Sequence, residues 1–117
     1  MSYQDIIPLV LTEIVGDFGY KLFANKGGYK PFLVGTVGYI GVVYFLIRSL
    51  QGSNILLVNG AWDGVSALIE SIAAIVFLGE RLDNPYQIIG LILIIIGLFC
   101  LKIPLKREKQ FIFPKLF

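Results

Sequence analysis

The chain has 117 residues, of which 56% are hydrophobic and only 15% are charged, and its mean hydropathy is +0.80. A soluble domain carries about a quarter charged residues because its surface faces water, so this composition excludes a water-soluble globular domain and indicates a membrane protein. One cysteine, no histidine and a net charge of +2 exclude a disulfide framework, the usual zinc sites and a long basic block for nucleic acid.

Four apolar segments each come close to the roughly 20 residues that a helix needs to cross a bilayer. They are residues 6–23, 31–49, 55–78 and 86–103. The connections between them are short and rich in turn-forming or charged residues, so successive spans should run antiparallel. We expect an all-α membrane protein: a four-helix transmembrane bundle over residues 1–104, and a basic, aromatic tail over residues 105–117 suited to lipid headgroups. The expected location is the cell inner or plasma membrane.

The first span contains two carboxylates, Glu13 and Asp17, which lie one turn apart on the same helix face as Tyr20. A charge at mid-bilayer costs at least about 2.5 kcal/mol, so such residues usually face the interior of a bundle and serve a function. A carboxylate there can hold a proton or a cation but not both, which couples cation export to proton entry. Two alternatives stay open: a protonated Glu13 bonded to a neighbouring helix, and neutralisation of Asp17 by Lys21.

The third span carries a polar line that falls within about a 60° arc of the helix. Its members are Asn59, Asp63, Ser66 and Glu70. Such a line usually borders a cavity or path, although interhelical hydrogen bonds that hold the bundle together are the alternative. Trp62 flanks this line, and its flat ring suits organic cations, although core packing would also explain it. In the second span, Tyr39 offers both a ring and a hydroxyl group.

The fourth span places Gly90 and Gly97 on one helix face. Small residues let helices approach closely in lipid, so we expect this face to mediate dimerisation; packing of the span against its own bundle is the alternative. Lysine and arginine counts give no firm orientation, with six on the side of the N-terminus and tail and four on the other. That balance is compatible with insertion in both orientations.

These motifs resemble the small multidrug resistance family of four-helix transporters. The matching stretches are LTEIVGDFGYKLF, NGAWDG, GERLDNP and the Gly90/Gly97 pair. The resemblance covers roughly residues 6–103. It implies an antiparallel, dual-topology homodimer that works by alternating access, with the Glu13 carboxylates of both subunits binding protons or cationic substrate. Trp62 and Tyr39 would line the shared pocket, and the glycines of the fourth span would mark the dimerisation helix.

The chain also departs from that family. Family members commonly have an aromatic residue at the position of Asn59, a small or hydroxyl residue at those of Asp17 and Asp63, and a glycine at that of Ser66; Glu70 is unusual as well. Losing an aromatic ring and gaining acids weakens the case for flat hydrophobic drugs. It favours a smaller or more highly charged cation, such as a polyamine or guanidinium compound.

The leading hypothesis is therefore a proton-coupled antiporter that exports small organic cations of the polyamine, guanidinium or quaternary ammonium type, without cofactor or metal. No nucleophile–base pair, phosphate loop or dinucleotide fingerprint indicates an enzyme. The alternative is a non-transporting membrane subunit that binds a partner protein, which would copurify with it in stoichiometric amount. A heterodimer with a paralogous chain is a third possibility, tested by whether this chain alone transports.

Overall fold

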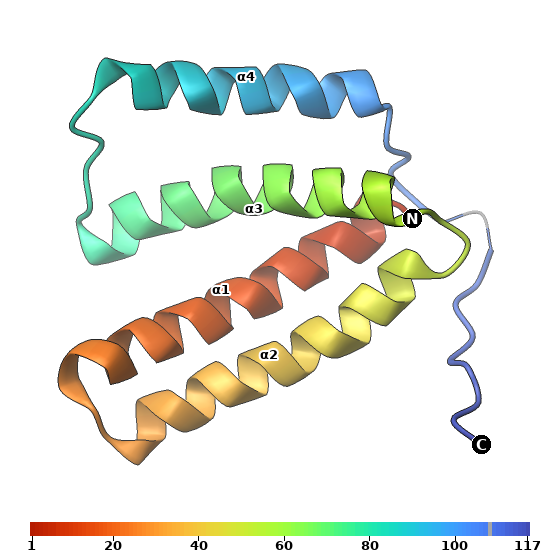
Figure 1. Ribbon diagram of the computed structural model, residues 1–117, viewed down its shortest axis with the longest axis horizontal. Helices are drawn as coiled ribbons and strands as arrows, with labels where there is room; N and C mark the ends of the chain where they lie inside the picture. The colour runs from red at the N-terminus through yellow and green to blue at the C-terminus, as the bar shows by residue number, and fades with distance from the viewer. Residues whose placement is uncertain (108) are drawn as a thin grey trace.

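The computed structural model describes residues 1–107 and 109–117, and over these residues the chain is all-helical, as expected. Its four helices are α1 (Tyr3–Lys26), α2 (Tyr29–Leu50), α3 (Ile55–Leu78) and α4 (Pro85–Leu101). Figure 1 shows them lying side by side in one layer, in the order α2, α1, α3, α4, and the molecule measures 41 × 37 × 18 Å. The fold is therefore a flat layer with two broad faces.

Two of the helices, α2 and α3, are long and apolar enough to cross a membrane by length and composition. The α4 helix is strongly apolar but has 17 residues, and α1 has the length but carries acids along it. Many large apolar side chains are exposed. Val37 and Ile40 of α2, for example, are each 65% exposed. Such surfaces suit contact with lipid or with another apolar helix, because exposing apolar side chains to water costs free energy.

Glycines bring α1 and α2 into the closest contact of the fold. A Cβ atom added to Gly19 would lie 2.5 Å from the backbone nitrogen of Gly35, and Gly16 and Gly38 approach each other similarly. Small residues at these positions let two backbones come together, as lipid-embedded helices require. The α3 helix packs on α1 and on α4 to a similar extent, whereas α4 contacts α3 alone among the helices. The fourth helix therefore does not close a compact four-helix bundle within one chain.

The tail after α4 folds back over the end of the helices instead of leaving them. The backbone N–H of Tyr3 donates to the carbonyl oxygen of Pro104 at 2.9 Å, which satisfies one of the free donors at the start of α1. Further on, the Gln51 side chain exchanges two hydrogen bonds with the backbone of Ile112, at 2.7 and 3.3 Å. Figure 1 shows the tail running past the end of α2.

A buried ion-pair network, which the sequence pattern did not indicate, fastens the tail to α1 and α2. Asp5 is fully buried, and its carboxylate accepts from Arg48 Nε at 3.0 Å and from Arg107 Nη1 at 3.3 Å. Both guanidinium groups also lie over the Phe111 ring, 5.6 and 5.8 Å from its centre. Ser2 donates a further hydrogen bond to Asp5. Three segments that are distant in sequence thus meet at one buried carboxylate.

We expect Arg107→Ala to lower the free energy of unfolding by about 2–3 kcal/mol, because it leaves the buried Asp5 with one cation fewer. Arg48 stays in place, so the loss is smaller than removal of every partner would give. Lys115→Ala, which removes an exposed basic residue from the same tail, is the matched control. Denaturant titration of both variants in detergent checks this prediction. Equal free energies of unfolding for the two variants would show that the network does not stabilise the fold.

Candidate functional site

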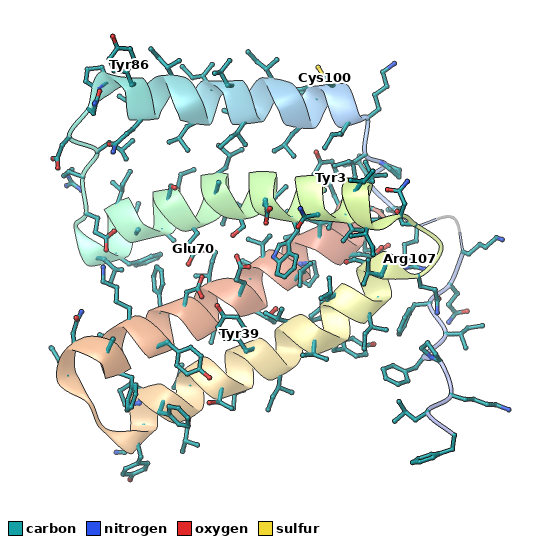
Figure 2. All side chains as sticks on the ribbon, viewed as in Figure 1. Tyr3, Tyr39, Glu70, Tyr86, Cys100 and Arg107 are labelled. Atoms are coloured by element: carbon teal, nitrogen blue, oxygen red, sulfur yellow. The ribbon has the colours of Figure 1, made fainter. Side chains whose placement is uncertain are left out.

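Three carboxylates from α1 and α3 come together inside the layer. Each of Glu13, Asp17 and Glu70 offers an oxygen, and these oxygens all lie within 4.8 Å of one another. Figure 2 shows Glu70 reaching from α3 towards α1, whereas Tyr86 and Cys100 lie on the outer side of α4. We refer to these three residues as the acid cluster. It is partly buried, and its oxygens are close enough to ligate a metal ion or to surround a small organic cation.

Hydroxyl groups hold the acid cluster in place from two sides. Ser66 of α3 donates to Glu13 and lies 3.4 Å from a carboxylate oxygen of Glu70. The Tyr39 hydroxyl group of α2 donates to Asp17, and its ring stacks on that of Tyr20 with centres 5.5 Å apart. Three carboxylates this close repel one another when ionised away from bulk water, and a bound proton or cation relieves that repulsion. The cluster is therefore suited to hold protons or a cation.

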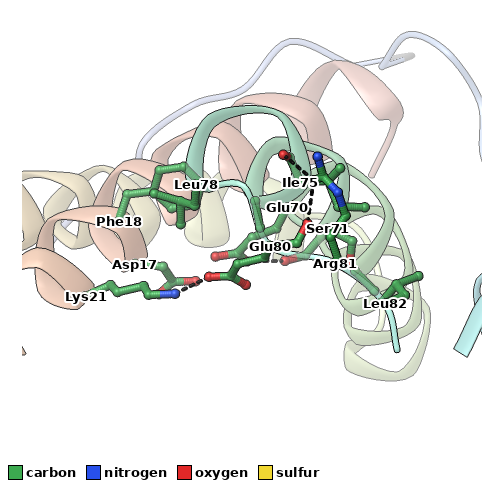
Figure 3. A pocket seen from close by; sticks show the side chains of 13 residues that line it. Asp17, Phe18, Lys21, Glu70, Ser71, Ile75, Leu78, Glu80, Arg81 and Leu82 are labelled. Atoms are coloured by element: carbon green, nitrogen blue, oxygen red, sulfur yellow. Dashed lines mark hydrogen bonds and ion pairs between the residues drawn. The ribbon is translucent and has the colours of Figure 1, made fainter. Parts of the chain in front are cut away.

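A cavity of about 420 Å³ is bordered by α1, α3 and the connection to α4, and Asp17 and Glu70 of the acid cluster line it. Figure 3 shows Asp17 and Glu70 on its wall, with Lys21 and Arg81 nearer the connection. Its volume suits a small organic molecule. The cavity gives a ligand access to the cluster from one end of the helices.

Lys21 takes a different partner from the one that the sequence left open. It forms an ion pair with Glu80, and both side chains are about half exposed, at 48% and 46%. Such exposed pairs contribute little to stability. Asp17 accepts a hydrogen bond from Tyr39, and Lys21 is paired with Glu80 of the α3–α4 connection. Lys21 therefore does not neutralise Asp17 by direct pairing.

Trp62 lies beside the acid cluster on α3. Its indole nitrogen is buried and has no hydrogen-bond partner among the described residues, and it is close to the Glu13 carboxylate. Buried tryptophan nitrogens usually have a partner. Trp62 also packs against the hydrophobic core, so a core role and a binding role are compatible.

The polar line of α3 is divided between two surroundings. Ser66 and Glu70 join the acid cluster, whereas Asn59 and Asp63 are exposed. Asp63 borders a second cavity of about 560 Å³, lined by α3 and α4, together with Gly64 and Gly97. The line is therefore shared between the side of α3 that meets α1 and the side that faces α4. In this chain alone, Asn59 and Asp63 are thus not part of the cluster.

The glycines of α4 face open space. A Cβ atom added to Gly90 or Gly97 would meet nothing within 4 Å in the described part of the chain, whereas one added to Gly64 would meet Leu98 at 2.9 Å. It is Gly64 of α3, then, that permits close packing of α4 within the chain. Gly90 and Gly97 do not seat α4 on its own helices.

Sequence reasoning missed two contacts at the site. Tyr39 was predicted to face a ligand, but its bond to Asp17 depends on how α2 crosses α1, which no local pattern reports. Glu80 lies in the connection between α3 and α4, and its pairing with Lys21 was not predicted. Its pairing with Lys21 could have been suspected, because α1 and α3 run in the same direction and the two opposite charges lie at their C-terminal ends.

Comparison with known proteins gives one family and several relatives. The profile of the family described as Small Multidrug Resistance protein matches residues 1–94. The chain is 26% identical over 106 residues to the quaternary ammonium compound-resistance protein QacC of Staphylococcus aureus, covering 88% of this chain and 95% of that protein. It is 26% identical over 102 residues to the multidrug transporter PA4990 of Pseudomonas aeruginosa, covering 87% and 92%. No solved structure matches the chain.

Proposed function

The chain belongs to the small multidrug resistance family, and we propose that it exports small organic cations in exchange for protons at the acid cluster. The observation that carries this proposal is the convergence of Glu13, Asp17 and Glu70 beside a cavity. A group of carboxylates suited to hold either protons or a cation is the simplest device for exchanging one for the other. The name of one relative, a quaternary ammonium compound-resistance protein, agrees with a cationic substrate, and that of the other, a multidrug transporter, agrees with transport.

We propose a substrate that donates several N–H bonds, such as a guanidinium or polyamine, in preference to a quaternary ammonium ion. A guanidinium group presents planar donors that match carboxylate oxygens, and three acids offer it more than one bidentate partner. A quaternary ammonium ion has no donors and depends on aromatic faces instead. Close to the acid cluster, Tyr39 and Tyr20 stack on each other, and the indole of Trp62 lies against the core, which leaves few free ring faces.

We further propose that the working unit is an antiparallel homodimer that inserts in both orientations and opens to each side in turn. The flat shape of the chain, and the exposed positions of Asn59 and Asp63, support a second copy covering the open face of α3. Gly90 and Gly97 support self-association through α4, because a Cβ atom added to either would meet nothing within 4 Å in the described chain. A homodimer would bring two acid clusters towards one pathway, which a polyamine with separated ammonium groups could bridge.

Transport by the purified chain in liposomes tests the proposal. With an outward-directed proton gradient, labelled guanidinium should accumulate inside, and the internal pH should rise as protons leave in exchange. The chain should do this without any other protein, which separates it from a subunit that needs a paralogue or partner. Uptake no faster than in protein-free liposomes, with or without the gradient, would overturn the proposal.

A further inference from the structure

A basic pocket lies at the end of the molecule that the tail covers. It has a volume of about 690 Å³ and is bordered by the chain start, the α2–α3 connection and described residues of the tail, among them Pro104 and Pro114. Three basic residues line it, namely Lys106, Arg107 and Lys109, and none of its described lining residues is acidic. The acid cluster and the cavity beside it are lined by other residues. The pocket is thus a separate site of positive charge.

The tail that forms this pocket is fixed at both ends. Pro104 is bonded to the start of α1, and Ile112 exchanges two hydrogen bonds with Gln51 at the end of α2. Arg107 is held between these points by Asp5. The lysines therefore extend from an anchored segment, which loses less conformational freedom when a ligand binds than a loose tail would.

The charge of the whole tail region points to an anionic ligand. Residues 102–117 contain five basic residues and one acid, Glu108, a net charge of +4. Glu108 lies outside the described residues, and its charge is included in this balance. Arg107 is already paired with Asp5, so Lys106 and Lys109 are the lining cations that extend from exposed positions. Basic clusters next to a transmembrane helix attract anionic lipid.

Apolar side chains next to the pocket would suit the acyl part of such a lipid. Leu105, Ile112 and Leu116 of the tail are 76%, 74% and 81% exposed. The tail follows directly after α4 in the chain. The segment therefore lies where the apolar helices end and the bilayer surface begins. Exposed leucine and isoleucine beside lysine is the composition expected of a segment at the lipid headgroup level.

We propose that this pocket binds the headgroup phosphate of an anionic phospholipid, with Lys106 and Lys109 as its charge partners and the exposed apolar residues of the tail against the acyl chains. The site is independent of the exported cation. It would hold the tail, and through Arg107 and Asp5 the start of α1, against the membrane surface.

Native mass spectrometry of the full chain in detergent tests the site, with phosphatidylglycerol, phosphatidylcholine of equal chain length, or inorganic phosphate added. Phosphatidylglycerol should bind more tightly than phosphatidylcholine. The double variant Lys106→Gln, Lys109→Gln should weaken phosphatidylglycerol binding by about 25-fold, at roughly fivefold for each lysine. The control Lys26→Gln, Lys30→Gln makes the same change in net charge at exposed positions at the other end of α1 and α2, and should have little effect.

Three outcomes would overturn the proposal. Equal binding of the two lipids would remove any role for lipid charge. Equal losses in the two double variants would show a response to net charge and not to this pocket. Displacement of phosphatidylglycerol by an equal concentration of inorganic phosphate would mean that the pocket binds free phosphate. Size-exclusion profiles identical to that of the unaltered chain ensure that the variants compared are folded.

Discussion

Glu13→Gln should reduce proton-driven cation uptake by about 10- to 100-fold, which brings it close to the rate of protein-free liposomes. The change keeps the size of the side chain and its ability to accept a hydrogen bond from Ser66. It removes the carboxylate charge for which the proton and the cation compete. The expected range follows from the 1.5–3 kcal/mol that hydrogen bonds to charged groups contribute. Guanidinium uptake under a fixed pH gradient measures the effect directly.

Two further variants separate the loss of charge from other causes. Asp83→Asn makes the same acid-to-amide change at an exposed position in the α3–α4 connection, and should transport normally. Glu13→Asp keeps the carboxylate but shortens the side chain, and should retain partial transport. Transport by Glu13→Gln at the rate of Asp83→Asn would exclude Glu13 from the exchange, whatever else the site does.

The second large effect concerns selectivity. The double variant Asp17→Asn, Glu70→Gln should weaken guanidinium binding by about 10- to 100-fold, while tetramethylammonium binding changes by no more than about threefold. The reason is that a guanidinium group donates to several carboxylates at once, whereas a quaternary ion donates to none. Each of the two acids has an oxygen within 4.8 Å of a Glu13 carboxylate oxygen, so removing their charges changes the candidate site directly.

Competition binding with the two cations checks this prediction in the same preparation. The ratio of their dissociation constants is the informative quantity, because a general loss of folded protein lowers both affinities equally. Tyr86→Phe, at an exposed position at the start of α4, controls for handling of the variants and should leave the ratio unchanged. A ratio equally unchanged in the double variant would mean that Asp17 and Glu70 have no part in substrate choice.

The sequence was most informative where physical constraints are local. Apolar length and short polar connections predicted four helices, because a spanning helix must satisfy its backbone within itself and cover about 30 Å of hydrocarbon. Helical periodicity placed Glu13, Asp17 and Tyr20 on one face, and put Ser66 and Glu70 on one line of α3. In the structure these two faces meet. An acid in an apolar span is the signal from which the sequence predicts Glu13 as the centre of the candidate site.

Contacts between distant segments could not be predicted in this way. Asp63 has the same periodicity as Ser66 and Glu70, yet it is exposed and borders the cavity between α3 and α4. The pairing of Asp5 with Arg48 and Arg107 joins the two ends of the chain, and the sequence showed only isolated charges near helix ends. Which neighbour a helix chooses depends on side-chain shape across the whole interface, as with α4, which contacts α3 alone.

The most direct test of proton exchange at the acid cluster is calorimetric titration of the chain with guanidinium, across pH and in two buffers of different ionisation enthalpy. Trp62, the only tryptophan, reports binding independently through its fluorescence. If protons and cation compete for the same carboxylates, cation binding releases protons, and affinity falls as pH is lowered because protons then occupy the oxygens. Binding of equal affinity at every pH, without proton release in either buffer, would contradict exchange at this site.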